Sequence, residues 1–178
     1  MKHAGIVHRA QITATLVAVT LVSFAQGALA GDPCPLSGYS MSYIAHEAHG
    51  DLIADNRLAR AIERLSNGAD PKAFETKTNL CVARTMAGQL SRAGYACKRA
   101  LEMAAEEMQA ADESNRHDAA GRLAIASINL GVLTAMRGDH EGAEIHFRQA
   151  MQQGVYNNTA FRNLSHLHFD DPEAIAVR

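Results

Sequence analysis

The sequence has no tryptophan, and aromatic residues make up only 5% of its 178 positions. Few stretches are rich in β-branched residues, so no credible sheet is predicted. Apolar residues nevertheless make up 47% of the chain, which is typical of a globular protein. Helices rich in alanine pack through small side chains, and this composition therefore favours an all-α protein over a sandwich or barrel.

The N-terminal residues have the pattern of a secretory signal peptide. Lys2 and Arg9 form a basic start, residues 12–25 are an apolar run, and Ala28-Leu29-Ala30 is a small-x-small cleavage site. The run is shorter than the roughly 20 residues of a membrane-spanning helix, although an uncleaved anchor stays an alternative. No later stretch is predicted to span a membrane. We therefore expect an exported protein, periplasmic or secreted, with no integral membrane span after cleavage at residue 30.

The charge balance is mildly acidic. Cleavage would leave 15 of the 17 Lys and Arg against all 19 Asp and Glu, a formal net charge of −4 with histidine neutral. An acidic chain does not provide the positive field with which proteins attract nucleic acids or anionic membranes. We therefore expect no nucleic-acid partner.

No motif that carries chemistry is present. The chain lacks His-Glu-x-x-His, Gly-x-Ser-x-Gly, a phosphate-binding glycine loop and Cys-x-x-Cys. His46 and His49 could share a helix face, but nothing forces convergent metal ligands. Glu102 and Glu106 have helical spacing, and a solvated helix face is favoured over an acid–base pair. We expect no enzyme, no cofactor and no metal site.

Small and apolar residues recur in one order along two stretches of the chain. Each copy opens with Asn-Leu-small and continues with glycine, alanine, a larger residue and alanine: Leu80, Gly88, Ala93, Cys97 and Ala100 in the first copy, and Leu130, Gly138, Ala143, Phe147 and Ala150 in the second. A third opening occurs at Asn163-Leu164-Ser165. Glycine at the end of a helix permits a left-handed turn into the next helix, so each copy predicts a hairpin of two helices.

This order resembles the tetratricopeptide repeat. The resemblance covers roughly residues 71–170 and extends weakly back to residue 51. It implies an all-α fold of stacked antiparallel helix hairpins, a tetratricopeptide-like α-solenoid with about two full repeats and partial flanking repeats. The two Asn-Leu pairs at 79 and 129 are 50 residues apart, whereas the next interval matches the family's period of about 34. An extended second helix and a polar link over residues 112–118 account for the surplus.

The domain organisation follows from these features. We expect a signal peptide over residues 1–30, an extended leader over 31–50 and the helical repeat domain over 51–178. Gly68 is predicted as a helix C-cap and Asp70 as an N-cap. Helices are expected over residues 51–66, 71–87, 90–111 and 158–168, with a short helix suggested over 40–49 and a stub over 171–177.

By resemblance, the first helices of successive repeats line a concave groove for a peptide. This places Asn79, Asn129 and Asn163 in the groove. Val82, Val132 and His166 lie one turn further on, flanked by Thr78, Ile128 and Arg162. Asparagine offers two donors and an acceptor, which suits an extended peptide backbone. The alternative is that these asparagines form hydrogen bonds within the scaffold, between stacked helices.

The cysteines are also interpreted through the resemblance, which places Cys81 and Cys97 on the facing helices of one hairpin. A disulfide there would contribute on the order of 3 kcal/mol, and two buried thiols are the alternative. Cys34 would then be free or would pair between chains.

The sequence thus favours a non-catalytic exported module that binds an unidentified protein or peptide through its groove. Two alternatives stay open: a structural or oligomerising envelope component, and a metal-handling protein that uses its histidines.

Overall fold

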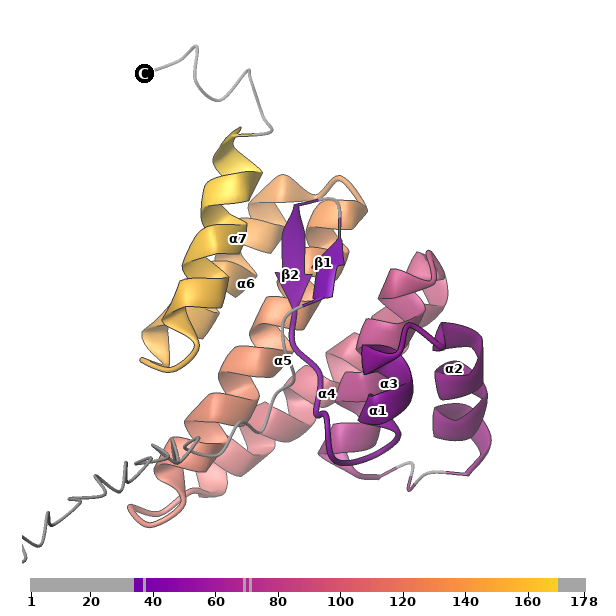
Figure 1. Cartoon of the computed structure of the whole chain (residues 1–178). Coiled ribbons are helices and arrows are strands. Elements are labelled where there is room, and N and C mark those ends of the chain that lie inside the picture. Colours follow the sequence, from indigo (N-terminus) through magenta and orange to yellow (C-terminus); the bar gives the residue numbers. More distant parts are fainter. Residues whose placement is uncertain (1–33, 37, 69, 71, 170–178) are drawn as a thin grey trace, which may run out of the picture.

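The computed structural model describes residues 34–36, 38–68, 70 and 72–169. Two short strands precede seven helices in this part of the chain (Figure 1). The elements are β1 (Cys34–Leu36), β2 (Tyr39–Met41), α1 (Gly50–Ala54), α2 (Leu58–Asn67), α3 (Phe74–Met86), α4 (Leu90–Ala110), α5 (Arg116–Met136), α6 (His140–Gln152) and α7 (Asn157–Phe169).

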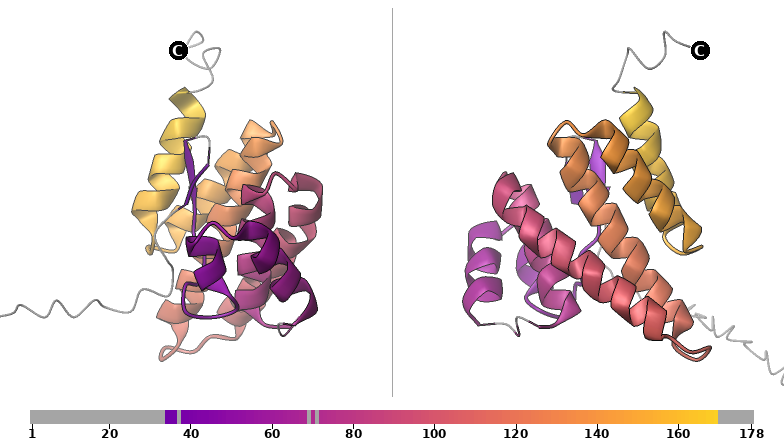
Figure 2. Two further views of the ribbon diagram at one scale, coloured as in Figure 1. Left: turned by 45° about the vertical axis from the view of Figure 1, so that its right-hand side comes forward. Right: turned by 180° about the vertical axis from the view of Figure 1, so that it is seen from behind.

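From α2 onward each helix packs against the next one in the chain (Figure 2). The predicted all-helical class is confirmed. The central helix is α5, which contacts α3, α4, α6, α7 and β2. No stretch after the signal peptide was expected to be able to span a membrane, but α5 is long and apolar enough to cross one. Its central position explains this composition, because 83% of its most apolar stretch is buried inside the fold. Its composition is that of a helix surrounded by protein.

Two glycines end the first helices of the predicted hairpins as expected. Gly88 follows α3 with φ 72°, and Gly138 follows α5 with φ 84°. Side chains other than glycine are strained in this left-handed region, so these positions fix where each helix stops. Asp139 then caps α6, because its carboxylate accepts a hydrogen bond from the Gly142 N–H at 2.9 Å.

Small residues lie where the paired helices cross. Ala93 and Ala143 are completely buried. In the first hairpin Cys81 on α3 and Cys97 on α4 form a disulfide, with 4.8 Å between their Cα atoms. This linkage is compatible with an exported, oxidising location.

Several expectations for local structure were wrong. The helix suggested over residues 40–49 does not form, since residues 39–41 are a strand that pairs with β1 in an antiparallel hairpin. The helix expected over residues 51–66 is split into α1 and α2 at Asn56, whose φ of 56° no helix can contain.

The predicted caps before α3 also differ from the structure. Gly68 follows α2 with φ −124°, so it is not a left-handed cap. Asp70 accepts a hydrogen bond from the Lys72 N–H at 2.8 Å, three residues before the N-cap of α3 at Ala73. The predicted signal peptide and the stub over residues 171–177 lie outside the described residues.

Candidate functional site

An extended segment of the chain lies across the faces of α3, α5 and α7 (Figure 1). It comprises residues 39–44, which we call the docked segment. All six of its residues are buried, and Met41 is completely inaccessible to solvent. The segment runs from α7 past α5 to α3, so it crosses the helices in the reverse of their order along the chain.

Two asparagines bind the first half of the docked segment in the same way. Asn163 on α7 accepts the Ser40 N–H at 2.8 Å and donates to the Ser40 carbonyl at 2.8 Å. Asn129 on α5 accepts the Ser42 N–H at 2.8 Å and donates to the Ser42 carbonyl at 2.7 Å. Each amide therefore satisfies both polar groups of one backbone residue.

Asn79 on α3 repeats this arrangement and extends it. Its Oδ1 accepts the Ile44 N–H at 2.7 Å, and its Nδ2 lies 3.0 Å from the Ile44 carbonyl. The same Nδ2 is 2.9 Å from the Glu47 carbonyl and 3.1 Å from that of Ala48. An amide nitrogen has two hydrogens, so the three carbonyls share them. Asn79 thus holds both the end of the docked segment and the turn that follows it.

These three side chains, Asn79, Asn129 and Asn163, form what we call the asparagine ladder. The ladder binds every second residue of an extended chain, because successive backbone N–H groups of a strand point to opposite edges. All three asparagines are at least 99% buried, so each bond forms away from competing water. The arrangement recognises backbone rather than side chains, as a neighbouring strand would.

Side chains of the docked segment supply the apolar contacts. The Tyr39 ring stacks on Phe147 with 6.3 Å between centroids and meets the edge of His166 at 4.5 Å. Tyr39, Met41 and Tyr43 belong to the same core cluster as Val82 and Val132. Alternate bulky side chains are thus buried against the helices, whereas Ser40 and Ser42 between them are small.

Some of the predicted groove residues contact the docked segment, and others lie elsewhere in the fold. Asn79, Asn129 and Asn163 contact the docked segment through hydrogen bonds, and His166 contacts it through Tyr39. Ile128 was expected to flank the ladder, but it packs in a separate cluster with Ala124, Ala150 and Ala160.

The other two expected flanking residues differ in their exposure to solvent. Arg162 is exposed. Thr78 is buried, and its hydroxyl has no hydrogen-bond partner among the described residues. The flanking roles inferred from the resemblance for Arg162 and Thr78 stay predictions.

The docked segment itself was missed by sequence reasoning. Its signal was present as the strict alternation Tyr39-Ser40-Met41-Ser42-Tyr43, which is typical of a strand with one buried face. The alternation is short, and the residues that bind it are 35 to 123 positions away.

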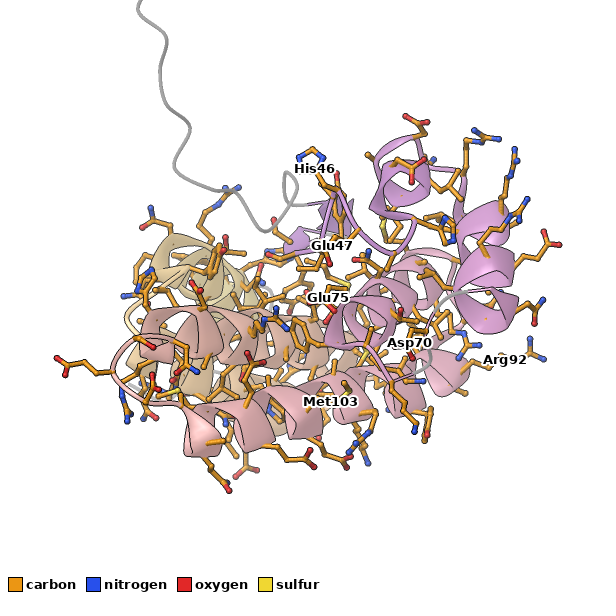
Figure 3. All side chains as sticks on the ribbon, turned by 90° about the horizontal axis from the view of Figure 1, so that it is seen from below. His46, Glu47, Asp70, Glu75, Arg92 and Met103 are labelled. Atoms are coloured by element: carbon orange, nitrogen blue, oxygen red, sulfur yellow. A yellow bond between two sulfur atoms is a disulfide. The ribbon has the colours of Figure 1, made fainter. Side chains whose placement is uncertain are left out.

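Three carboxylate side chains lie near one another, outside the docked segment. Figure 3 shows Glu47, Asp70 and Glu75 on one side of the molecule, where with His49 they line a shallow pocket. Glu75 forms an ion pair with Arg122 at 3.0 Å. Within the described ranges, no group of three or more His, Cys, Asp or Glu side chains could hold a metal ion.

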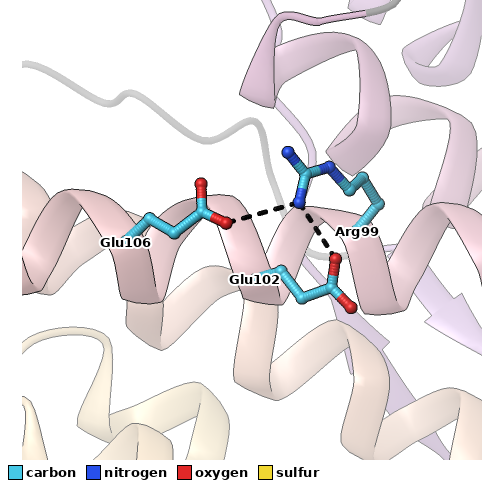
Figure 4. A network of polar contacts seen from close by, with 3 residues as sticks. All are labelled: Arg99, Glu102 and Glu106. Carbon is cyan, nitrogen blue, oxygen red and sulfur yellow. Dashed lines mark hydrogen bonds and ion pairs between the residues drawn. The ribbon is translucent and has the colours of Figure 1, made fainter.

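The acidic stretch of α4 forms surface ion pairs. Arg99 lies 3.0 Å from the Glu102 carboxylate and 3.5 Å from that of Glu106 (Figure 4). These side chains are exposed, and exposed ion pairs contribute little to stability because water and salt screen the charges. The arrangement matches the solvated face that the sequence favoured over an acid–base pair.

One titratable group lies half-buried near the site. Burial lowers the pKa of His146 on α6, next to the Phe147 ring that stacks on Tyr39. Its Nδ1 is buried without a hydrogen-bond partner in the described part of the chain.

Comparison of the chain with family models, with curated proteins and with solved structures found no match.

Proposed function

We propose that this chain is an exported, non-catalytic helical-repeat module, arranged as a tetratricopeptide-like solenoid, whose groove binds an extended polypeptide segment. The observation that carries the proposal is the asparagine ladder. Three amides from three separate helices each bind the N–H and carbonyl of alternate backbone residues. Such spacing fits a partner in β conformation and little else.

The chemistry of the docked segment describes the partner. Tyr39, Met41 and Tyr43 are buried, so the partner carries bulky apolar side chains at every second position. Ser40 and Ser42 are also buried, which leaves room only for small residues between them. The partner is therefore a protein with an extended stretch of alternating large apolar and small residues.

Binding such a partner requires the docked segment to leave the groove. The segment acts as a competing ligand within the same chain, and the apparent affinity for a partner is reduced by the fraction of closed molecules. Weakening the docked segment should therefore strengthen binding of an added peptide, provided that the ladder is intact.

A peptide titration tests this proposal. A fluorescent peptide of residues 34–48 is titrated into the mature chain and into a double variant Tyr39→Ser, Met41→Ser, whose own segment binds the groove less tightly. We expect binding roughly tenfold tighter to the double variant. Adding Asn129→Ala and Asn163→Ala to the double variant should remove the binding.

Circular dichroism establishes that each variant is folded, and stabilisation of the double variant by the peptide serves as a second readout. A folded double variant that neither binds the peptide nor gains stability from it would contradict the proposal.

The burial of the docked segment favours one second candidate function, a structural or oligomerising component. All six residues of the segment are buried, so this stretch serves as core as well as ligand. A segment with both roles can join two chains when it docks on a neighbour.

A further inference from the structure

We infer that the docked segment exchanges between two copies of this chain, so that residues 39–44 of each copy fill the groove of the other. The inference rests on the proposed function, because it requires a groove that recognises an extended backbone. The partner is a second copy, whose segment has the required sequence by definition.

The turn that connects the docked segment to α1 is strained. Ala48 has φ 44° and His49 has φ 58°, so two consecutive residues with side chains adopt the left-handed conformation. Both conformations are unfavourable for L-amino acids, and they persist only where surrounding contacts hold them.

Close packing imposes this strain. Gly50 follows directly, and a Cβ atom at that position would lie 2.0 Å from the Ile44 carbonyl oxygen. The backbone therefore folds back tightly against the end of the docked segment. The Gly50 N–H donates to the Glu47 carbonyl at 3.0 Å, which closes the turn.

Opening the chain at Ala48–Gly50 removes the strain and breaks two hydrogen bonds of the turn, from the Gly50 N–H to Glu47 and from Asn79 to the Ala48 carbonyl. Residues 39–47 would move together, and the hydrogen bonds of the ladder asparagines to Ser40, Ser42, Ile44 and Glu47 would form again with the identical residues of the other copy. The Tyr39 stacking on Phe147 would form again in the same way. Strained hinge loops favour exchange for this reason, and reciprocal exchange gives a closed two-fold dimer.

Substitutions in the turn should shift the equilibrium in opposite directions. A double variant Ala48→Gly, His49→Gly tolerates left-handed φ, so the closed monomer should become more stable relative to the dimer. The dimer dissociation constant should then rise by roughly tenfold. His49→Pro cannot adopt positive φ, and it should convert the chain to a dimer. The matched control is Asn56→Gly, which relieves a φ of 56° at the α1–α2 turn, outside the hinge, and should leave the equilibrium unchanged.

Light scattering over a range of protein concentrations measures these shifts, and a crosslink identifies the contact. Chains with a photoreactive phenylalanine at Tyr39 are prepared with ordinary and with heavy nitrogen, refolded together and irradiated. A crosslink from position 39 of one isotope to the peptide containing Phe147 of the other is expected.

Two results overturn the exchange. One is a wild-type chain and a folded His49→Pro variant that are both monomeric at every concentration. The other is a dimer in which position 39 crosslinks only to the Phe147 peptide of the same isotope, because such a crosslink forms within one chain. If the peptide of residues 34–48 still binds the Tyr39→Ser, Met41→Ser variant, the proposed function survives either result; if it does not, the groove proposal fails as well.

Discussion

The Phe147 ring lies against Gly131 so closely that no side chain fits between them. A Cβ atom on Gly131 would lie 2.6 Å from Cε1 of Phe147. In the aligned copies of the repeat, Gly131 corresponds to Cys81 and Phe147 to Cys97. One hairpin therefore joins its helices with a disulfide, and the other joins them with a large residue packed on a glycine.

Gly131→Ala should destabilise the protein by about 1–3 kcal/mol, because the added methyl overpacks the α5–α6 contact. Gly121→Ala is the matched control on the same helix, since its Cβ would meet only Tyr156 at an ordinary 3.6 Å. That control should be neutral or stabilising by about 0.5–1 kcal/mol, as alanine is the better helix former. Urea unfolding of both variants measures the difference, and equal effects would contradict the packing described.

Reduction of the Cys81–Cys97 bond should lower the free energy of unfolding by on the order of 3 kcal/mol, since the bond restricts the unfolded chain. Thermal unfolding with and without reductant measures the loss. A double variant Cys81→Ala, Cys97→Ala should be insensitive to reductant, whereas Cys34→Ser should keep the full response. A Cys34→Ser variant that is insensitive would show that the bond lies elsewhere.

Acidification should destabilise the fold through His146. Burial lowers the pKa of folded His146 below the ordinary value of 6.5, so the unfolded chain binds more protons as the pH falls through that value. The contribution is fully present above pH 6.5 and is lost progressively below it, until the folded histidine is also protonated. Urea unfolding at pH about 7.5 and about 5.5 should show a smaller loss for His146→Gln than for the wild-type chain. An identical loss in the two chains would be inconsistent with a depressed pKa at this site.

Alanine substitutions at the three asparagines of the ladder should lower the free energy of unfolding by different amounts. Asn129→Ala leaves the buried Ser42 N–H and carbonyl without partners, and each such group costs about 1–3 kcal/mol. Asn163→Ala should cost about the same, and Asn79→Ala more, because Asn79 also holds the Glu47 and Ala48 carbonyls. Amide hydrogen exchange supplies the local readout, with faster exchange at Ser42 in Asn129→Ala and at Ser40 in Asn163→Ala. Exchange that rises equally at both residues in both variants would mean that the segment is not held residue by residue.

The helical part of the fold could be predicted because its signals are local. Leu130 and Gly138 lie within one helix and its turn, and helix α4 follows the predicted boundaries to within one residue. The disulfide followed from the repeat order, which places Cys81 and Cys97 on facing helices.

The extended segment could not be predicted in the same way. The apolar residues Met41, Tyr43, Ile44 and Ala48 suggest a short helix over residues 40–49. Their conformation is set by side chains from three distant helices, and tertiary contacts override so weak a local preference. The asparagines were identified, but nothing near them in the sequence indicates that residues 39–44 lie against them.

Asn129 and its two counterparts are proposed to bind the backbone of an extended chain through its N–H and carbonyl groups. The most direct test compares three versions of the peptide of residues 34–48 binding to the Tyr39→Ser, Met41→Ser variant: the unmodified peptide, a Ser42→Ala peptide, and a peptide whose Ser42 N–H is replaced by an ester oxygen. We expect roughly tenfold weaker binding of the ester and little change for Ser42→Ala, because only the ester removes the hydrogen bond to Asn129. Adding Asn129→Ala to the receptor should abolish the difference between amide and ester. An ester that binds as tightly as the amide would show that the Asn129 hydrogen bond to the backbone does not contribute to binding.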